Sequence, residues 1–225
     1  MSTLPFTSAL QRLHRLGWQP GATMHDDWWQ HLGLAEWRDK YHRYPACRQA
    51  IDRVIVARRG FPRAPLPACL DSRQNALLAA EPRIDSLIIA LGVIALDCAD
   101  HLLVKQYRAH LVGGIGERAC TQLLAVHRGW RSSARVALPE RLIETATVAA
   151  VHWWQRDADA CIVATILASR LPPLVDAGAD VRAAMIEPAN TPNERTFAAF
   201  PYPAPPQTPA AGSAADKLLK LARFF

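Results

Sequence analysis

The sequence of 225 residues lacks paired cysteines. Structural zinc sites need clustered ligands, and secreted disulfide scaffolds usually carry an even number of closely spaced cysteines. Here the number is odd, and no two form a C-x-x-C pair: Cys47, Cys69, Cys98, Cys120 and Cys161. We therefore expect free thiols in a reducing compartment and no structural zinc.

Long hydrophobic runs are also missing. The most apolar stretch, LIIALGVIAL at Leu87–Leu96, has about half of the roughly 20 residues that a membrane-spanning helix needs. The first residues, MSTLPFTSALQRLHRLG, do not combine a charged start with an apolar run and a small-residue cleavage site, as a signal peptide does. The sequence predicts a soluble cytoplasmic protein with no direct membrane span.

The patterns of common catalytic centres are absent. The chain has no G-x-S-x-G, S-x-x-K or H-E-x-x-H, and the glycines of GGIG (Gly113–Gly116) are not followed by the lysine of a phosphate-binding loop. Cys98 and His101 could form a thiol–imidazole pair, but any two residues at i, i+3 of a helix have that spacing. We expect no enzymatic activity and no cofactor, and we interpret GGIG as a turn between helices.

Basic residues outnumber acidic ones, with a formal net charge of +6, but no block of five or more Lys/Arg occurs. No predicted helix shows the exposed basic side of a DNA-recognition helix. Nucleic acid is therefore not an expected partner. A positive balance of this size would suit an acidic protein surface.

Apolar residues at spacings of three and four predict helices almost throughout. The widest apolar face predicts a central buried helix and is made by Ile84, Leu87, Ile88, Leu91, Ile94, Ala95 and Cys98. This helix is expected to continue through Leu111. A second long helical segment, Leu34–Arg59, contains Pro45, which should divide it at Tyr44.

The chain is predicted to be all-α, with three parts. Residues 1–187 form a single compact multi-helix domain, and residues 188–212 form a linker with seven prolines. Residues 213–225 form a short amphipathic helix that Ser213 can cap. Such a peptide is marginal as a free helix and needs a surface for its apolar side. Its deletion should leave the melting temperature of the domain nearly unchanged.

Histidines and aspartates cluster in HDDWWQH at His25–His31, with further candidates in DCADH (Asp97–His101) and at His152. Asp27 and His31 have the i, i+4 spacing of helical metal ligands, but two ligands do not make a site. The expected structure is a helix whose N-terminus is stabilised by aspartates and whose polar side is solvated. No metal is expected.

Tryptophans are concentrated in the same region. Trp28 and Trp29 are neighbours and point about 100° apart on a helix, and the doublet recurs at Trp153–Trp154. These rings either close a small helical core, or one of each doublet lies in a partner interface. The predicted partner-binding residues are Trp28, Trp29, Trp37 and Tyr41 near the N-terminus, and Leu218, Leu221, Phe224 and Phe225 in the last helix.

The order of these segments carries a family resemblance. DDWWQHLGLAEW is followed by RYPACRQAIDRVI, then by LIIALGVIALDCADHLL, and then by LPERLIETATVAAVHWW. Over roughly residues 25 to 170 the chain resembles the sorting-platform adaptors of bacterial type III secretion systems, the SctK family, and most of all its plant-pathogen and Burkholderiales-type members. The Pro-rich linker and the terminal helix do not match features of that family.

The resemblance implies a non-enzymatic, all-helical cytoplasmic protein located at the inner membrane. It would link the cytosolic domain of the inner-membrane ring protein to the pod protein of the sorting platform, and it would aid protein transport and virulence without a cofactor. Two alternatives remain open at this point. One is a helical regulator or chaperone that uses its C-terminal helix as a binding arm, and the other is a metal-dependent enzyme built on the scattered histidines and aspartates.

Overall fold

The computed structural model describes residues 8–62, 65–126, 138–158, 161–173 and 213–223, and within these ranges it contains helices and no strand, which confirms the predicted all-α class. The α-helices are α1 (Ser8–Trp18), α2 (Asp27–His31), α3 (Arg38–Arg43), α4 (Pro45–Arg59), α5 (Ser72–Ala80), α6 (Ile84–Ala95), α7 (Lys105–Ile115), α8 (Glu117–Val126), α9 (Leu142–Ala158), α10 (Ile162–Leu167) and α12 (Ala214–Ala222). Short 3₁₀ helices are η1 (Pro20–Ala22), η2 (Ala35–Trp37), η3 (Glu81–Arg83), η4 (Ala99–Leu103), η5 (Pro139–Arg141) and η6 (Ala168–Arg170).

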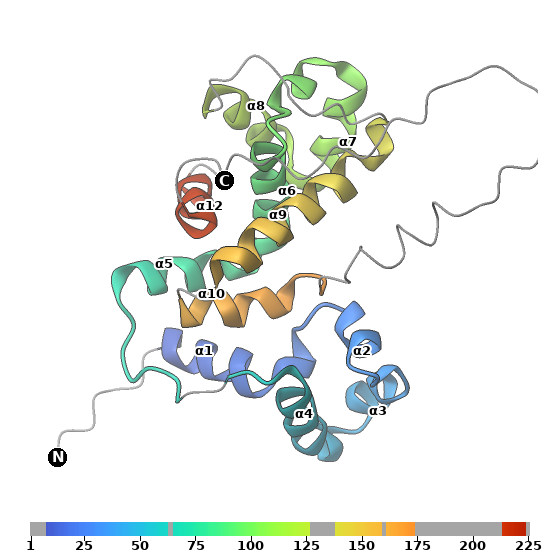
Figure 1. Cartoon of the computed structure of the whole chain (residues 1–225), viewed down its shortest axis with the longest axis vertical. Coiled ribbons are helices and arrows are strands. Elements are labelled where there is room, and N and C mark those ends of the chain that lie inside the picture. Colours follow the sequence, from blue (N-terminus) through green and yellow to red (C-terminus); the bar gives the residue numbers. More distant parts are fainter. Residues whose placement is uncertain (1–7, 63–64, 127–137, 159–160, 174–212, 224–225) are drawn as a thin grey trace, which may run out of the picture.

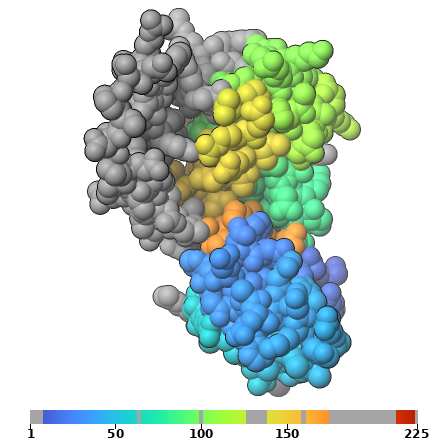
Figure 2. Space-filling model, turned by 90° about the vertical axis from the view of Figure 1, so that its right-hand side faces the viewer, coloured from blue at the N-terminus to red at the C-terminus, as the bar shows by residue number. Residues whose placement is uncertain are grey.

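The helices form two lobes with separate hydrophobic cores (Figure 1). The large lobe contains α5 to α10 and α12, and α1 contributes Leu13 and Leu16 to its core. The small lobe contains α2, α3, α4 and the short η1 and η2, and its core is made by Met24, Trp29, Leu34, Tyr41, Ile51 and Ile55. Figure 2 shows the small lobe as a blue knob below the large one.

The large lobe is organised around α6 and α9, which pack against each other along most of their length (Figure 1). Leu87 and Leu91 of α6 are fully buried, as predicted for the central helix. The predicted continuation of this helix through Leu111 is wrong. Asp97 adopts a left-handed conformation (φ 51°), and the chain then turns into η4 before it starts α7. A left-handed residue ends an α-helix, because it breaks the repeat of backbone hydrogen bonds.

Several helix boundaries follow from local chemistry. Tyr44 has an extended backbone before Pro45, and the chain divides there into α3 and α4, as predicted. Asp71 and Gln74 form a reciprocal capping box at the start of α5. Gly116 separates α7 from α8 with a φ of 86°, a value suited to glycine. The turn predicted for GGIG is confirmed at Gly116 only, because Gly113–Ile115 form the end of α7.

The buried carboxylate of Glu81, whose side chain is 3% exposed, lies near the junction of the two lobes. Arg12 of α1 donates to both of its oxygens at 2.8 Å, and Arg170 places its Nε 3.5 Å from the same carboxylate. Arg170 also donates to the carbonyl of Thr23 at 2.8 Å. The carboxylate therefore connects α1 and η3 to the segment that follows α10, and Arg170 extends this connection into the small lobe.

The terminal helix α12 packs on the large lobe instead of standing apart (Figure 1). Leu218 is fully buried and Leu221 is 3% exposed, among residues of α5, α6 and α9. Asp157 accepts a hydrogen bond from the amide of Ala214 at 2.8 Å, and Ser213 caps the helix as predicted. The expectation of an appended helix that can be removed at no cost is corrected, because its apolar side completes the core of the domain.

None of the helices in the described ranges is both long and apolar enough to cross a membrane. The end of the predicted domain, from residue 174, and the predicted linker at 188–212 lie outside the described residues.

Candidate protein-interaction surface

The predicted aromatic anchor of the small lobe is divided between its core and its surface. Trp29 and Tyr41 are each 2% exposed, with ring centroids 5.4 Å apart. Their inclusion in a partner surface is corrected, because both rings are enclosed by their own lobe. Trp37 keeps the predicted accessibility at 40% exposed, with the ammonium of Lys40 4.5 Å from its ring. Partner binding by Trp37 stays a prediction.

Trp28 connects the small lobe to the large one. Its indole N–H donates to the carbonyl of Leu171 at 2.9 Å, and its ring lies under the guanidinium of Arg59 at 5.6 Å. His31 packs edge-on against the same ring. The ring is half-buried by these contacts, so its main role in this structure is to join the lobes.

The second tryptophan doublet lies inside the large lobe. Trp153 is 5% exposed and Trp154 is 1% exposed, and the indole of Trp154 donates to the carbonyl of Ala164 at 3.0 Å. The alternative that placed one of these rings in a partner interface is wrong. Helix α9 is covered by α6, α10 and α12 on different sides, so adjacent positions can both be buried.

The predicted binding residues of the terminal helix are also internal where the structure describes them. Leu218 and Leu221 face the large lobe, and this corrects their assignment to an external partner. Phe224 and Phe225 lie outside the described residues. The arrangement disfavours a binding arm, because the apolar side that an arm would offer is occupied by the protein's own core.

The scattered metal-ligand candidates do not converge. In the described ranges, no group of three or more His, Cys, Asp or Glu side chains could hold a metal ion. His25 pairs with Asp27 at 3.5 Å on the surface, and His31 contacts Trp28 instead of Asp27. The thiol of Cys98 is directed at the carbonyl of Val93.

A buried aspartate fixes the architecture of the small lobe. Asp52 of α4 is 3% exposed, and it accepts hydrogen bonds from the amide of Gly21 at 3.0 Å and from the hydroxyl of Tyr41 at 3.2 Å. Burial raises the pKa of Asp52 above its ordinary value. Burial and the nearby Asp52 also raise the pKa of Tyr41 to about 12. The contacts tie η1 and α3 to α4.

An open cleft of about 500 Å³ lies over this buried pair. One wall is a single face of α4, where residues recur at steps of three and four, and the other is the end of α1 with η1. The cleft is lined by Trp18, Gln19, Ala22, Tyr41, Pro45, Arg48, Gln49, Asp52 and Arg53. The cleft thus combines an aromatic ring, charged side chains and an open volume.

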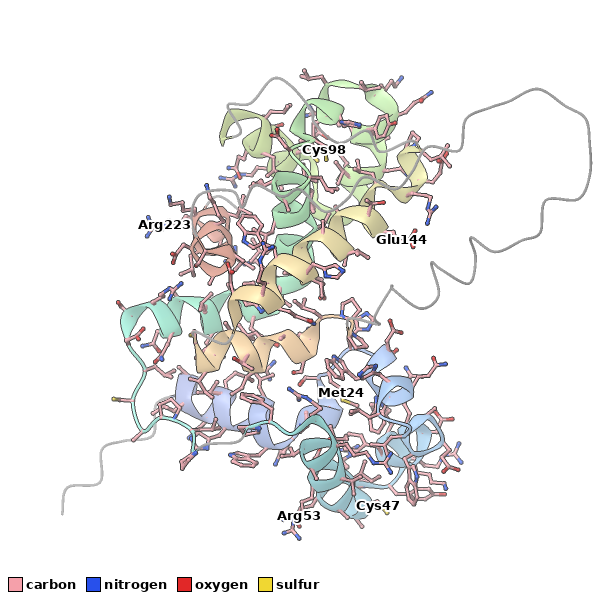
Figure 3. All side chains as sticks on the ribbon, viewed as in Figure 1. Met24, Cys47, Arg53, Cys98, Glu144 and Arg223 are labelled. Carbon is pink, nitrogen blue, oxygen red and sulfur yellow. The ribbon has the colours of Figure 1, made fainter. Side chains whose placement is uncertain are left out.

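Two arginines of α4 give the cleft its positive charge. Arg48 is held by its own lobe, because its Nε donates to the carbonyl of Tyr41 at 3.0 Å and its Nη2 to that of His42 at 3.1 Å. Arg53 lies one and a half turns further on and projects from the lower edge of the lobe (Figure 3). It makes no hydrogen bond or ion pair with the residues that the structure describes.

The positive charge of this surface can be recognised in the sequence, although the basic residues do not form a contiguous block. Residues 38–59 hold seven Lys or Arg and two Asp, a formal charge of +5, while the whole chain carries +6. One of the two aspartates is the buried Asp52. Positive charge is therefore concentrated on α3 and α4 instead of being dispersed.

Trp18 is absent from the predicted partner-binding residues, although it is 45% exposed at the edge of the cleft. Helix α1 buries Leu13 and Leu16, and a residue two positions after Leu16 lies about 200° away on a helix. The apolar stripe of α1 thus indicates that Trp18 points away from the core. The position of Trp18 relative to the buried stripe of α1 is therefore the sequence signal that identifies it as a surface residue.

The fold and this cleft define a two-lobed, all-helical protein with an open surface lined by arginine and tryptophan. A family model described as a type III secretion system subunit matches residues 11–173, and the chain belongs to this family. No curated protein and no solved structure matches the chain. The matched range includes both lobes and ends before the terminal helix α12.

Proposed function

We propose that the protein is a non-enzymatic adaptor of a type III secretion system, which links the cytosolic domain of the inner-membrane ring protein to the pod protein of the sorting platform. Membership in a family of secretion system subunits supports the setting. The adaptor role is carried by one observation, the presence of exposed apolar residues at both ends of a two-lobed body. An adaptor needs two separate surfaces that are held in a fixed relation.

The exposed large hydrophobic side chains fall into two sets. Trp18, Trp37, Tyr44 and Val54 lie in the stretch from the end of α1 to α4, which is in the lower part of Figure 1. Leu103, Val104, Leu138 and Val148 lie in or next to η4, η5 and α9 of the large lobe. Trp and Tyr are enriched among the anchors of protein interfaces, and exposed Leu and Val side chains add apolar contact area. Each set offers a surface for a different partner.

The connection between the lobes supports a rigid adaptor. Arg170, which is paired with Glu81, donates to the carbonyl of Thr23, Trp28 donates to Leu171, and the amide of His25 donates to the carbonyl of Ser169 at 2.9 Å. Buried charged and neutral hydrogen bonds at one joint oppose rotation of one lobe against the other. A movement of one lobe would therefore move the other lobe with it.

The test is affinity purification of the tagged protein from its native bacterium after mild cross-linking, with identification of the co-purified proteins. We expect both ring and pod proteins with the wild type. Trp37→Glu at one end and Leu103→Glu at the other should each lose one of the two and keep the other. His152→Glu, an exposed position on α9 between the ends, is the matched control and should keep both.

Two outcomes contradict the adaptor role. The first is recovery of neither protein from cells that are assembling secretion machines. The second is loss of the same single partner by both variants, which would mean that the protein has one interface instead of two. Circular dichroism and melting curves of each variant establish that the fold is intact.

A further inference from the structure

The cleft beside Trp18 has the composition of a recognition surface for negative charge. An aromatic ring at its edge is 45% exposed, and two arginines of α4 stand on its other wall. The cleft between these walls is open and has a volume of about 500 Å³. A volume of this size accommodates side chains of a bound segment, since ligand pockets in proteins begin at about 300 Å³.

The guanidinium of Arg48 is already held in place in the free protein, so it need not be ordered when it binds a carboxylate. Its two hydrogen bonds to the carbonyls of Tyr41 and His42 fix the guanidinium, which also lies 5.7 Å from the ring of Tyr41. The remaining N–H groups are available, and a planar guanidinium binds a carboxylate with two parallel hydrogen bonds. Less side-chain entropy is lost when the arginine is already held in place.

The single carboxylate in the cleft, Asp52, does not cancel the positive charge that Arg48 and Arg53 present to an incoming ligand. Asp52 lies on the floor at 3% exposed, and its two oxygens accept the hydrogen bonds from Gly21 and Tyr41. The other charged groups that line the cleft are Arg48 and Arg53. The segment that contains them, residues 38–59, has a formal charge of +5, although its Arg38 is paired with Asp26.

We propose that this cleft binds an acidic segment of another protein, with carboxylates on Arg48 and Arg53 and an apolar side chain against Trp18. The proposal rests on the proposed function only for the expectation that this partner is a secretion-system subunit. The side chains themselves point to the chemistry of the segment. Opposite charge should speed association and weaken as salt rises.

A protein segment fits the cleft better than nucleic acid or an anionic membrane. Arg48, which is fixed by the carbonyls of Tyr41 and His42, and Arg53 stand across the cleft from the ring of Trp18, an arrangement that suits a narrow, extended ligand. A lipid surface is usually met by an amphipathic helix with an exposed apolar face, and duplex DNA by a basic element that enters its groove. Helix α4 instead buries its apolar side, including Ile51 and Ile55, inside the small lobe.

The experiment places the photo-crosslinking residue benzoylphenylalanine at Gln49, an exposed position of the cleft, in the full-length protein in its native bacterium. After irradiation, the cross-linked peptide is identified by mass spectrometry. We expect a specific adduct with a segment rich in Asp and Glu. Arg53→Glu should reduce its yield at least about tenfold, because it replaces attraction with repulsion.

Arg118→Glu is the matched control, since Arg118 is also exposed on a helix but lies in the large lobe. It should change the yield by less than about twofold, as expected of a charge outside the interface. Each variant also receives a melting curve, and both positions are exposed enough for the fold to tolerate glutamate. A second probe at Leu103, on the large lobe, reports whether the protein has joined an assembly at all.

The outcomes separate this inference from the proposed function. If the probe at Leu103 cross-links to a secretion subunit but the probe at Gln49 gives no adduct, the proposed binding of an acidic segment in the cleft is wrong. The adaptor role would not be affected by that result. An acidic Gln49 partner from outside the secretion apparatus would support the cleft and contradict the adaptor role. An adduct with a neutral or basic segment, or Arg53-dependent binding of the purified protein to duplex DNA or phosphatidylserine vesicles, would overturn the inference.

Discussion

Gly92 on α6 lies directly against the backbone of Ala146 on α9. A methyl group added at Gly92 would come within 1.8 Å of the carbonyl oxygen of Ala146, and within 2.7 Å of its Cα. Two helices can approach this closely only where one of them has no side chain. The crossing holds the central pair of the large lobe together, and it depends on this one residue.

Gly92→Ala should therefore destabilise the protein by about 3 kcal/mol or more, since overpacking against backbone cannot be relieved by a side-chain rotation. Gly113→Ala is the control, because it lies in α7 with no atom within 4 Å of the added methyl. This second change should be neutral or stabilise by about 0.5 kcal/mol through helix propensity. Urea denaturation measures both. Equal effects of the two substitutions would show that the crossing is looser than described.

The second prediction concerns the contribution of the Glu81 carboxylate to stability. Replacement by Gln leaves the guanidinium groups of Arg12 and Arg170 without their buried counter-charge, and these side chains are 36% and 24% exposed. We expect a loss of about 2–3 kcal/mol, below the value for fully buried pairs because water reaches both arginines. Glu144→Gln, in an exposed pair with Arg141, should cost less than about 0.5 kcal/mol. Similar losses for the two variants would mean that the buried pairing of Glu81 contributes no more to stability than a surface ion pair.

Tyr41 makes stability depend on pH in the alkaline range. Burial and the neighbouring Asp52 raise the pKa of its hydroxyl to about 12, above the ordinary value of 10. A raised folded-state pKa contributes stability that is complete below pH 10 and is lost as the pH rises through about 12. The free energy of unfolding of the wild type relative to Tyr41→Phe should then fall by about 2 kcal/mol between pH 9 and pH 12.

The comparison with Tyr41→Phe is needed because Arg59 acts in the opposite direction. Burial lowers its pKa to about 10, so loss of its proton adds stability as the pH rises. Tyr44→Phe, at a side chain that is 51% exposed, is the control for loss of a tyrosine hydroxyl at the surface and should change the free energy of unfolding by less than about 0.5 kcal/mol. A flat difference between wild type and Tyr41→Phe would mean that Tyr41 is more solvated than the structure indicates.

The terminal helix gives a fourth prediction. Leu218→Ala should cost about 2–5 kcal/mol, because it empties a fully buried site between α12 and the large lobe. Lys217→Ala at the adjacent position should cost less than about 0.5 kcal/mol. Deletion of residues 213–225 should lower the melting temperature by several degrees. An unchanged melting temperature would restore the interpretation of this helix as a separate arm.

The sequence alone determined the class of the fold and many of its local boundaries. Tyr44 before Pro45, Asp71 with Gln74, and Ser213 at the start of α12 act within a few residues, through backbone sterics and capping hydrogen bonds. The apolar period of α6 likewise required its burial, whatever covered it. These features depend on neighbours along the chain, so they can be predicted without a tertiary structure.

The tertiary structure decided which residues are available to a partner. Trp29 and Trp37 are alike in the sequence, but only Trp29 meets Tyr41, and Leu218 and Leu221 proved to be core once α12 was placed on α6 and α9. The cleft exists because the end of α1 stands opposite one face of α4. Burial is set by the meeting of helix faces that are distant in the sequence, and local periodicity shows that a face is apolar without showing what covers it.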